Sequence, residues 1–169
     1  MRKITVGDPR DPRTICGPVI SARQRDRIES YLRSVAGDGG TFACSGGGVP
    51  GRETGFWVKP TVIAGLTNDA KAAREEIFGP VLVVLAHDGD DHAVAIANDS
   101  PYGLSGAVFG ADLPRARAVA ARLRTGTVGI NDGVWFSPDV PFGGYKQSGI
   151  GREMGVPGFE EYLQIKSVA

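Results

Sequence analysis

A helical pattern of apolar residues stands near the start of the chain. The apolar positions recur at spacings of three and four residues: Ile28, Tyr31, Leu32 and Val35. This spacing places one apolar stripe along a helix. Ser21 and Gln24 match a capping box, in which each side chain bonds to the backbone at the other residue. Because Gly37 is a suitable C-terminal stop, we expect a half-buried helix from Ser21 to Gly37.

Short apolar runs alternate with helical patterns through the middle of the chain. The strand candidates are residues 41–44, 56–63, 81–85, 104–109 and 127–131. The run 81–85, Val-Leu-Val-Val-Leu, has no polar alternation, which is typical of a strand covered on both faces of a parallel sheet. Helices are expected over residues 69–76, after a cap at Asp90, and after a cap at Asp112 with Pro114 in the first turn. This order predicts an α/β fold with a mostly parallel sheet and flanking helices.

The length of 169 residues suits one domain with a single core. We divide it into an extended N-terminal segment (residues 1–20), an α/β core (residues 21–162) and a terminal strand (residues 163–169). Residues 158–162 have a helical pattern, and residues 132–147 form a loop whose length and exposed aromatics favour a function. Residues 46–55 are rich in glycine but lack the Gly-Lys-Ser/Thr ending of a P-loop, so we expect the tip of a surface hairpin.

The composition is that of an ordinary soluble globular protein. Lys and Arg number 19 and balance 19 Asp and Glu, so no basic excess points to nucleic acid or to a membrane surface. The longest apolar run is far shorter than the roughly 20 residues of a membrane span. The charged first residues lack the apolar core of a secretory signal. The two cysteines, Cys16 and Cys44, require no disulfide framework, so we expect a cytoplasmic protein.

Residues 74–80, Arg-Glu-Glu-Ile-Phe-Gly-Pro, place a carboxylate and an aromatic ring two positions apart. In an extended segment these two side chains face the same side. A carboxylate accepts two hydrogen bonds from a ribose diol, and an aromatic ring packs on a flat heterocycle. The residues alone leave two interpretations open, a nucleotide site and an exposed acidic pair beside a core phenylalanine.

Residues 141–153, Pro-Phe-Gly-Gly-Tyr-Lys-Gln-Ser-Gly-Ile-Gly-Arg-Glu, are dense in glycine, which permits positive φ and close approach of the backbone. Residues 149–155 imitate a dinucleotide fingerprint. Their spacing differs from it and no strand stands directly before them, so we exclude a Rossmann site here. A structural turn that closes the domain explains most of these glycines.

The two motifs, in this order, resemble the C-terminal part of the catalytic domain of the aldehyde dehydrogenase superfamily. The similarity runs from Val-Gly-Asp-Pro at residues 6–9 to Ile-Lys-Ser-Val at residues 165–168, and includes Asn-Asp-Ser-Pro-Tyr-Gly-Leu-Ser at residues 98–105. It implies the α/β fold of that domain and a terminal strand by which family members associate into homo-oligomers. It also implies oxidation of an aldehyde to a carboxylic acid with NAD or NADP as acceptor.

The resemblance assigns a cofactor role to the first motif. In the family, the second glutamate of this motif binds the nicotinamide-side ribose and the phenylalanine packs near the nicotinamide. These positions are Glu76 and Phe78. The phosphates and the adenine are bound by the family's coenzyme domain, which also chooses between NAD and NADP. We therefore expect weak or no cofactor binding by this chain alone.

The resemblance assigns a substrate role to the second half of the chain. The asparagine after the Thr-Val-x-Ile strand lies at the active-site end, and the following loop lines the aldehyde tunnel. The implied substrate residues are Asn131, Trp135, Phe136 and Phe142. Glu153 matches a glutamate that some members use in a proton relay, with a structural salt bridge as the alternative. Gly129 stands where many relatives carry a larger residue, which implies either a more open tunnel or repacked neighbours.

The family attacks the aldehyde with a cysteine thiolate, transfers hydride to NAD(P)⁺ and hydrolyses the thioester. We expect the nucleophile, the general-base glutamate and the coenzyme domain to lie before Met1, so these residues supply a clamp, a tunnel wall and a scaffold. One alternative is a truncated, non-catalytic product that oligomerises. Another is a thiol enzyme that uses Cys16 or Cys44, but neither has the electropositive context of a catalytic thiol.

Two histidines flank an acidic turn in the middle of the chain. The set comprises His87, Asp88, Asp90, Asp91 and His92. A metal site is conceivable there, but a solvated helix start explains the residues better, so no metal is expected.

Overall fold

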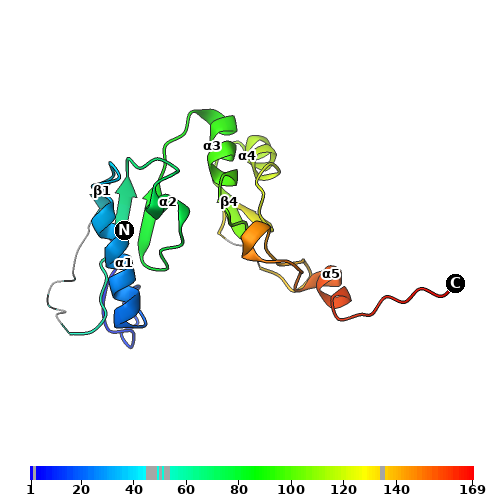
Figure 1. Cartoon of the computed structure of the whole chain (residues 1–169), viewed down its shortest axis with the longest axis horizontal. Coiled ribbons are helices and arrows are strands. Elements are labelled where there is room, and N and C mark those ends of the chain that lie inside the picture. Colours follow the sequence, from blue (N-terminus) through cyan, green and yellow to red (C-terminus); the bar gives the residue numbers. More distant parts are fainter. Residues whose placement is uncertain (2, 45–48, 50, 52–53, 134–135) are drawn as a thin grey trace. The chain divides into compact units, whose positions relative to one another are not determined.

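The computed structural model describes residue 1 and residues 3–44, 49, 51, 54–133 and 136–169 (Figure 1). The described residues form two compact units, Met1–Ala86 and His87–Ala169, which we call the N-terminal unit and the C-terminal unit. Most of the glycine-rich loop expected over residues 46–55 lies outside the described residues. The predicted division, with one core over residues 21–162, stays a prediction.

The N-terminal unit combines two helices with a small sheet. Its elements in chain order are α1 (Ala22–Ser34), β1 (Thr41–Cys44), β2 (Thr61–Ala64), α2 (Lys71–Arg74) and β3 (Val81–Val84). The strand order is β1-β2-β3, in which β1 and β2 are antiparallel and β2 and β3 are parallel. The expected strand over residues 56–63 begins only after Pro60, which has no N–H to donate to a sheet.

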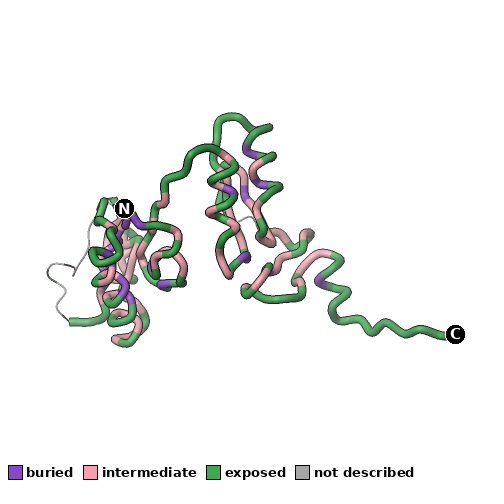
Figure 2. Tube along the Cα trace, turned by 45° about the horizontal axis from the view of Figure 1, so that its top comes forward, coloured by how far each residue is buried: buried purple, intermediate pink, exposed green. Residues whose placement is uncertain are grey.

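The apolar stripe of α1 lies in the core of this unit, as predicted. Ile28 and Val35 have 0% exposure and Tyr31 has 2%, and they pack with Ile63 of β2. Leu32 is only partly buried against the same cluster. Buried positions on α1 and the sheet are purple in Figure 2. Burial of these side chains is therefore what joins α1 to the sheet.

The start of α1 confirms one half of the predicted capping box. The Ser21 side chain accepts a hydrogen bond from the Gln24 backbone N–H at 3.2 Å. The reciprocal half is wrong, because the Gln24 amide donates to the carbonyls of Ile77 and Phe78 instead. A residue predicted to serve its own helix therefore reaches the motif at residues 74–80.

Strand β3 is covered on one face in the described part of the N-terminal unit. Val81 and Val83 pack against the core, whereas Leu82 and Val84 have 52% and 47% exposure. The prediction of a strand covered on both faces is therefore not met by these residues. Period-two side-chain alternation puts the two pairs on opposite faces, and the core of this unit covers only the first.

The C-terminal unit has a strand–helix–strand core. Its elements in chain order are α3 (Gly89–Asn98), β4 (Ser105–Val108), α4 (Leu113–Ala120), β5 (Thr127–Ile130), the 3₁₀ helix η1 (Lys146–Ser148) and α5 (Gly155–Glu160). Strands β4 and β5 are parallel and α4 connects them. The α/β class with parallel strands and flanking helices is therefore confirmed.

The two predicted aspartate caps of this unit have different outcomes. The Asp112 side chain accepts from the Arg115 N–H at 3.0 Å and caps α4, as predicted. The cap at Asp90 is wrong, because α3 begins at Gly89 with Asp88 in the cap position. The Asp90 carboxylate lies in the first turn and binds the Arg115 guanidinium at 2.7 and 2.8 Å, which joins α3 to α4.

The last residues of the chain follow α5 without a strand in the described single chain. Helix α5 begins at Gly155, earlier than the pattern at residues 158–162 indicates. Residues 163–169 are exposed throughout (Figure 2), with Ile165 at 100% and Val168 at 87%. A terminal strand that forms by pairing with another chain therefore stays a prediction. Among the described residues, no helix has the length and apolar character needed to cross a membrane.

Candidate functional site

The motif at residues 74–80 leaves α2 as extended chain and turns at Phe78. Glu75 has φ −100° and ψ 150°, while Phe78 has φ +62°. Ile77 is buried at 7% exposure, whereas Glu76 is exposed and Phe78 keeps 71% exposure. Glu76 and Phe78 thus flank the inward Ile77, although Phe78 itself is not extended. The two predicted cofactor residues, Glu76 and Phe78, both project away from the core of the N-terminal unit.

Side chains of α1 hold the backbone of this motif. The Gln24 Nε2 atom donates to the carbonyls of Ile77 at 3.1 Å and Phe78 at 2.7 Å. The Arg27 Nη2 atom donates to the carbonyl of Glu76 at 3.0 Å. A left-handed conformation at a bulky residue such as Phe78 costs about 1–3 kcal/mol. The donors from α1 stabilise this conformation, so the outward direction of Phe78 depends on residues far away in the sequence.

The two adjacent glutamates of the motif have different surroundings. The Tyr31 hydroxyl donates to the Glu75 carboxylate at 2.7 Å, and this bond, followed by burial, raises the pKa of Tyr31. The Glu76 carboxylate forms no hydrogen bond or ion pair with any described residue. Among the described residues, the Glu76 carboxylate therefore keeps both oxygens available to a ligand, whereas Glu75 uses Oε2 to accept from Tyr31.

Asn131 is held at the carboxyl ends of β4 and β5. Its backbone is left-handed, with φ +56°. Its side-chain amide accepts from the Gly110 N–H at 2.8 Å and donates to the Gly110 carbonyl at 2.9 Å. The amide therefore ties the segments that follow the two strands. These bonds use the amide oxygen and one of the two amide N–H groups. The predicted contact of Asn131 with substrate stays a prediction.

The small residue at position 129 has a local explanation. Gly129 is buried, and a Cβ atom there would overlap the carbonyl oxygen of Gly133 and lie 2.9 Å from that of Asp132. The turn after β5 crosses directly over this position. A larger residue at position 129 would therefore require the turn to move, which links this glycine to the path of the loop.

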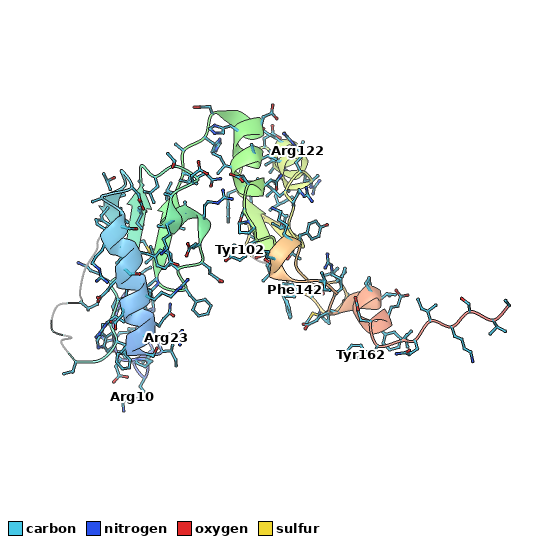
Figure 3. The ribbon with its side chains drawn as sticks, viewed as in Figure 1. Arg10, Arg23, Tyr102, Arg122, Phe142 and Tyr162 are labelled. Atoms are coloured by element: carbon cyan, nitrogen blue, oxygen red, sulfur yellow. The ribbon has the colours of Figure 1, made fainter. Side chains whose placement is uncertain are left out.

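The loop after β5 brings two of its aromatic residues together. The rings of Phe136 and Phe142 meet edge to face, with centroids 5.4 Å apart and an interplanar angle of 72°. Phe136 keeps 60% exposure and Phe142, labelled in Figure 3, is half-buried. The third predicted residue, Trp135, lies outside the described residues. An exposed aromatic pair of this kind presents apolar surface to a ligand.

The backbone of Glu153 pairs with that of Phe142, one member of this aromatic pair. Glu153 and Phe142 exchange two backbone hydrogen bonds, of 2.7 and 2.8 Å, as an antiparallel bridge. The Glu153 side chain is exposed, and it forms no ion pair within the described part of the chain. A cavity of about 360 Å³ is lined by both residues and by Tyr162. The proton-relay role stays a prediction, while the alternative salt bridge finds no partner among the described residues.

The sequence pattern missed Lys146, which anchors the end of the loop. Its Nζ atom donates to the carbonyls of Asn98 at 2.8 Å and Ser100 at 2.9 Å, at the C-terminal end of α3. The neighbouring Ser148 hydroxyl accepts from the Gly103 N–H at 2.9 Å. The available signal was that residues 98–105 and 141–153 both match the same family. The structure shows that these two motifs pack on each other.

The described surroundings of the two cysteines and the two histidines do not resemble those of a catalytic thiol or a metal ligand. Burial raises the pKa of the Cys16 thiol, which disfavours the thiolate, and Cys44 is half-buried at the end of β1. The Asp88 N–H donates to His92 Nδ1 at 3.0 Å, and His87 Nδ1 lies 3.0 Å from the Gly89 carbonyl. Both histidines thus contact the backbone at the start of α3. The described residues include no group of three or more His, Cys, Asp or Glu that could hold a metal ion.

Comparison with known sequences finds one family along the chain. The profile of the aldehyde dehydrogenase family matches residues 1–168. A betaine aldehyde dehydrogenase from Brucella melitensis biotype 2 is 51% identical over 170 residues, and one from Brucella ovis is 50% identical. Each alignment covers 99% of this chain but 35% of the relative. The chain therefore spans about a third of the length of these relatives.

Comparison with solved structures agrees. Betaine aldehyde dehydrogenase from Staphylococcus aureus in complex with NAD⁺ matches with a TM-score of 0.90 and 45% identity over 96% of this chain and 33% of that one. Aldehyde dehydrogenase from Mycobacterium tuberculosis with NAD⁺ matches with a TM-score of 0.91 and 47% identity, over 96% and 34%. Aldehyde dehydrogenase C from Pseudomonas syringae with NAD⁺ and octanal gives 0.90 and 48%, over 96% and 34%. The chain belongs to the aldehyde dehydrogenase family.

Proposed function

We propose that this chain is the cofactor-clamping and substrate-lining part of an NAD(P)-dependent aldehyde dehydrogenase, which oxidises an aldehyde to a carboxylic acid. The observation that carries the proposal is the pair of outward residues Glu76 and Phe78. The first has a carboxylate without a described partner, and the second has 71% of its surface exposed. The NAD⁺ complexes among the similar structures support the choice of cofactor.

The residues of the motif fit a nicotinamide riboside. The Glu76 carboxylate accepts hydrogen bonds from the two ribose hydroxyls, and the Phe78 ring packs on the flat nicotinamide. The backbone that carries both side chains is held by α1, so only the side chains themselves lose freedom when the cofactor binds. When bound, the cofactor supplies the hydride acceptor, and these residues set where its ring lies.

The loop after β5 supplies an apolar wall on the substrate side. The edge-to-face pair Phe136 and Phe142 carries this part of the proposal. An aromatic wall accepts an alkyl chain, and it also attracts a quaternary ammonium group through cation–π interaction. The names of the relatives include both kinds of compound, octanal and betaine aldehyde. We therefore propose an aldehyde that bears an alkyl or a trimethylammonium group.

The nucleophilic thiolate is proposed to come from sequence outside these residues. Burial raises the pKa of the Cys16 thiol, and Cys44 ends an apolar strand. An activated thiol requires a lowered pKa or an adjacent base. We expect no oxidation of octanal or betaine aldehyde by the purified 169-residue protein with NAD⁺. Cofactor reduction above the blank would contradict this part of the proposal.

The clamp is tested by Glu76→Gln in the longer enzyme to which the proposal assigns this chain. Loss of the carboxylate weakens hydrogen bonds to the ribose, so we expect the KM for NAD⁺ to rise about tenfold, with hydride transfer slowed. Glu29→Gln is the matched control, because Glu29 lies on α1 and pairs with Arg25 and Arg33. Unchanged NAD⁺ kinetics in Glu76→Gln would overturn the clamp.

Self-association is proposed for the exposed C-terminal segment. Leu163, Ile165 and Val168 have 54%, 100% and 87% exposure. An exposed apolar segment can add as a strand to a sheet edge of a second copy. This feature also supports the second candidate, a non-catalytic oligomer. We expect light scattering to give a homo-oligomer at tens of micromolar that Ile165→Lys weakens; a concentration-independent 17.7 kDa species would contradict it.

A cytoplasmic location is proposed from the free Cys16 and Cys44 alone.

A further inference from the structure

We propose that Tyr31 and Glu75 are the positioning pair of the cofactor clamp. By binding the first carboxylate of the motif against α1, Tyr31 selects the second carboxylate, that of Glu76, for the ribose. This inference rests on the proposed function, since it assigns a task to the residues behind Glu76. Both members of the pair act through the direction of Glu76 rather than on the cofactor itself.

The residues of the motif alone do not determine which of its two glutamates, Glu75 or Glu76, binds the ribose. Glu75 and Glu76 are adjacent and chemically alike, so either carboxylate is able to accept hydrogen bonds from a ribose diol. Adjacent residues of an extended segment point in different directions. A slip of one position would therefore present Glu75 in place of Glu76 and would carry Phe78 out of place as well. An interaction outside the motif has to fix the register.

The contacts of Tyr31 supply that interaction. Its hydroxyl is a donor to Glu75 Oε2 at 2.7 Å and an acceptor for Arg27 Nη2 at 2.8 Å. The residue is 2% exposed, so the hydroxyl would lose a hydrogen bond if Glu75 moved away. The same Arg27 nitrogen also donates to the Glu76 carbonyl at 3.0 Å. One continuous hydrogen-bonded network thus reaches both glutamates of the motif, the first by its carboxylate and the second by its backbone.

Two cations keep the Tyr31 ring in this orientation. The Arg27 guanidinium carbon lies 5.1 Å from the ring centroid, and the Lys71 ammonium lies 5.2 Å from it. Cation–π attraction of this kind favours one placement of the ring. Because the ring is held, the direction of its O–H is restricted, and so is the position of the carboxylate that accepts from it. Both glutamates are exposed, but the Glu75 carboxylate is bound to Tyr31 of α1, while the Glu76 carboxylate keeps no partner among the described residues.

The test measures NAD⁺ kinetics and thermal stability in the longer enzyme to which the proposed function assigns this chain. Tyr31→Phe removes the hydroxyl, which bonds to both Glu75 and Arg27, and Glu75→Ala removes the carboxylate that accepts from it. We expect either change to raise the KM for NAD⁺ about three- to tenfold, with a smaller change in kcat. Glu75→Gln keeps an oxygen that accepts from Tyr31 and should restore the KM to within about twofold of the unaltered protein. The double variant Tyr31→Phe/Glu75→Ala should be no worse than Tyr31→Phe alone, because Tyr31→Phe already removes the bond to Glu75.

A merely structural pair would behave differently. It would lower Tm and the amount of active protein while leaving the KM for NAD⁺ unchanged in the folded fraction, and that result overturns the proposal. Tyr102→Phe is the matched control, since Tyr102 is 41% exposed and lies outside the N-terminal unit. If Tyr31→Phe fails to fold, the comparison of Glu75→Ala with Glu75→Gln decides alone. No difference between those two variants in the KM for NAD⁺ overturns the positioning role.

Glu76→Gln distinguishes a failure of the positioning pair from a failure of the cofactor clamp. If Glu76→Gln leaves NAD⁺ kinetics unchanged, the clamp itself fails and the positioning pair fails with it. If Glu76→Gln raises the KM and both Tyr31→Phe and Glu75→Ala do not, the clamp stands and only the positioning pair is overturned. A raised KM in all three, with recovery in Glu75→Gln, supports the pair.

Discussion

The cofactor motif and the substrate loop are held in opposite ways. Side chains of α1 hold the motif at residues 74–80, where Gln24 and Arg27 donate to its carbonyls. The loop at residues 132–147 is held through the backbone bridge between Phe142 and Glu153, through glycines that leave no space for a side chain, and at its end by the Lys146 side chain. The motif depends on side-chain donors of α1, whereas most of the loop depends on the absence of side chains at close backbone contacts.

The difference indicates which substitutions each region tolerates. Loss of a donor behind the motif removes a hydrogen bond but leaves the core packing intact, so the motif is redirected and the unit stays folded. Addition of a methyl group beneath the loop forces backbone apart in a packed region, so the fold itself is disturbed. We therefore expect cofactor kinetics to report on the first region and global stability to report on the second.

The largest effect on this comparison is expected from Gly126→Ala. A Cβ atom at position 126 would overlap the carbonyl oxygen of Gly143, which belongs to the loop, and would lie 3.2 Å from the Leu104 carbonyl. Overpacking of this kind costs about 1–3 kcal/mol, and backbone atoms yield less than side chains, so we expect the upper end. Urea unfolding of the 169-residue protein measures the loss.

The matched control is Gly133→Ala, because a Cβ atom at position 133 meets no described atom within 4 Å. It should change the free energy of unfolding by less than about 0.5 kcal/mol. Equal losses in the two variants would show that close backbone packing does not hold the loop.

A smaller loss is expected from Lys146→Met. The substitution removes the donor from the carbonyls of Asn98 and Ser100 while keeping an apolar side chain of similar length. Hydrogen bonds from a charged donor are worth about 1.5–3 kcal/mol, and Lys146 is half-buried, so we expect about 1–2 kcal/mol in urea unfolding. Hydrogen exchange should also quicken at the Gln147 N–H, which bonds to the Pro101 carbonyl. Lys166→Met, in the exposed C-terminal segment, is the control, and an equal loss there would contradict the anchoring role.

The smallest expected effect is a change in how the free energy of unfolding depends on pH, caused by Tyr31 in the N-terminal unit. The hydrogen bond to Glu75, followed by burial, raises the folded-state pKa of Tyr31 above its unfolded value of about 10. The neutral phenol therefore contributes stability that is complete below about pH 10 and is lost as pH rises through the folded-state pKa. Unfolding free energies at pH 8–11 should fall more steeply for the unaltered protein than for Tyr31→Phe, by at most about 1.4 kcal/mol per pH unit. Tyr102→Phe should keep the original slope; a parallel fall for Tyr31→Phe would argue against ionisation at Tyr31.

Local signals in the sequence were enough for several elements. The stripe of Ile28, Tyr31 and Val35 predicted α1, because helical spacing and burial depend on residues within a few turns. Asp112 predicted the start of α4 for the same reason, since a cap and its partner lie three residues apart. The alternation of an extended segment predicts that Glu76 and Phe78 share one side, but it does not predict the left-handed backbone at Phe78, where Gln24 of α1 donates to the carbonyl.

The missed features depend on contacts between distant residues. Gln24 was assigned to its own helix, yet its amide bonds to residues 53 and 54 positions later. Asp90 was assigned as a cap, yet it pairs with Arg115, which is 25 positions away. Lys146 carried no local signal at all, because its acceptors lie 46 and 48 positions earlier. Sequence periodicity does not encode which remote carbonyl a long polar side chain reaches.

The positive φ of Phe78 limits what can be transplanted between proteins. A synthetic peptide of residues 74–80 would contain every letter of the motif, but nothing would hold Phe78 in the left-handed region, which bulky residues avoid. A chimera that received this segment without Gln24 and Arg27 would be in the same position. The motif keeps its conformation only together with the face of α1 that lies 49 to 54 positions earlier in the chain. A recombination point between the two segments would separate the donors from the carbonyls that they bind.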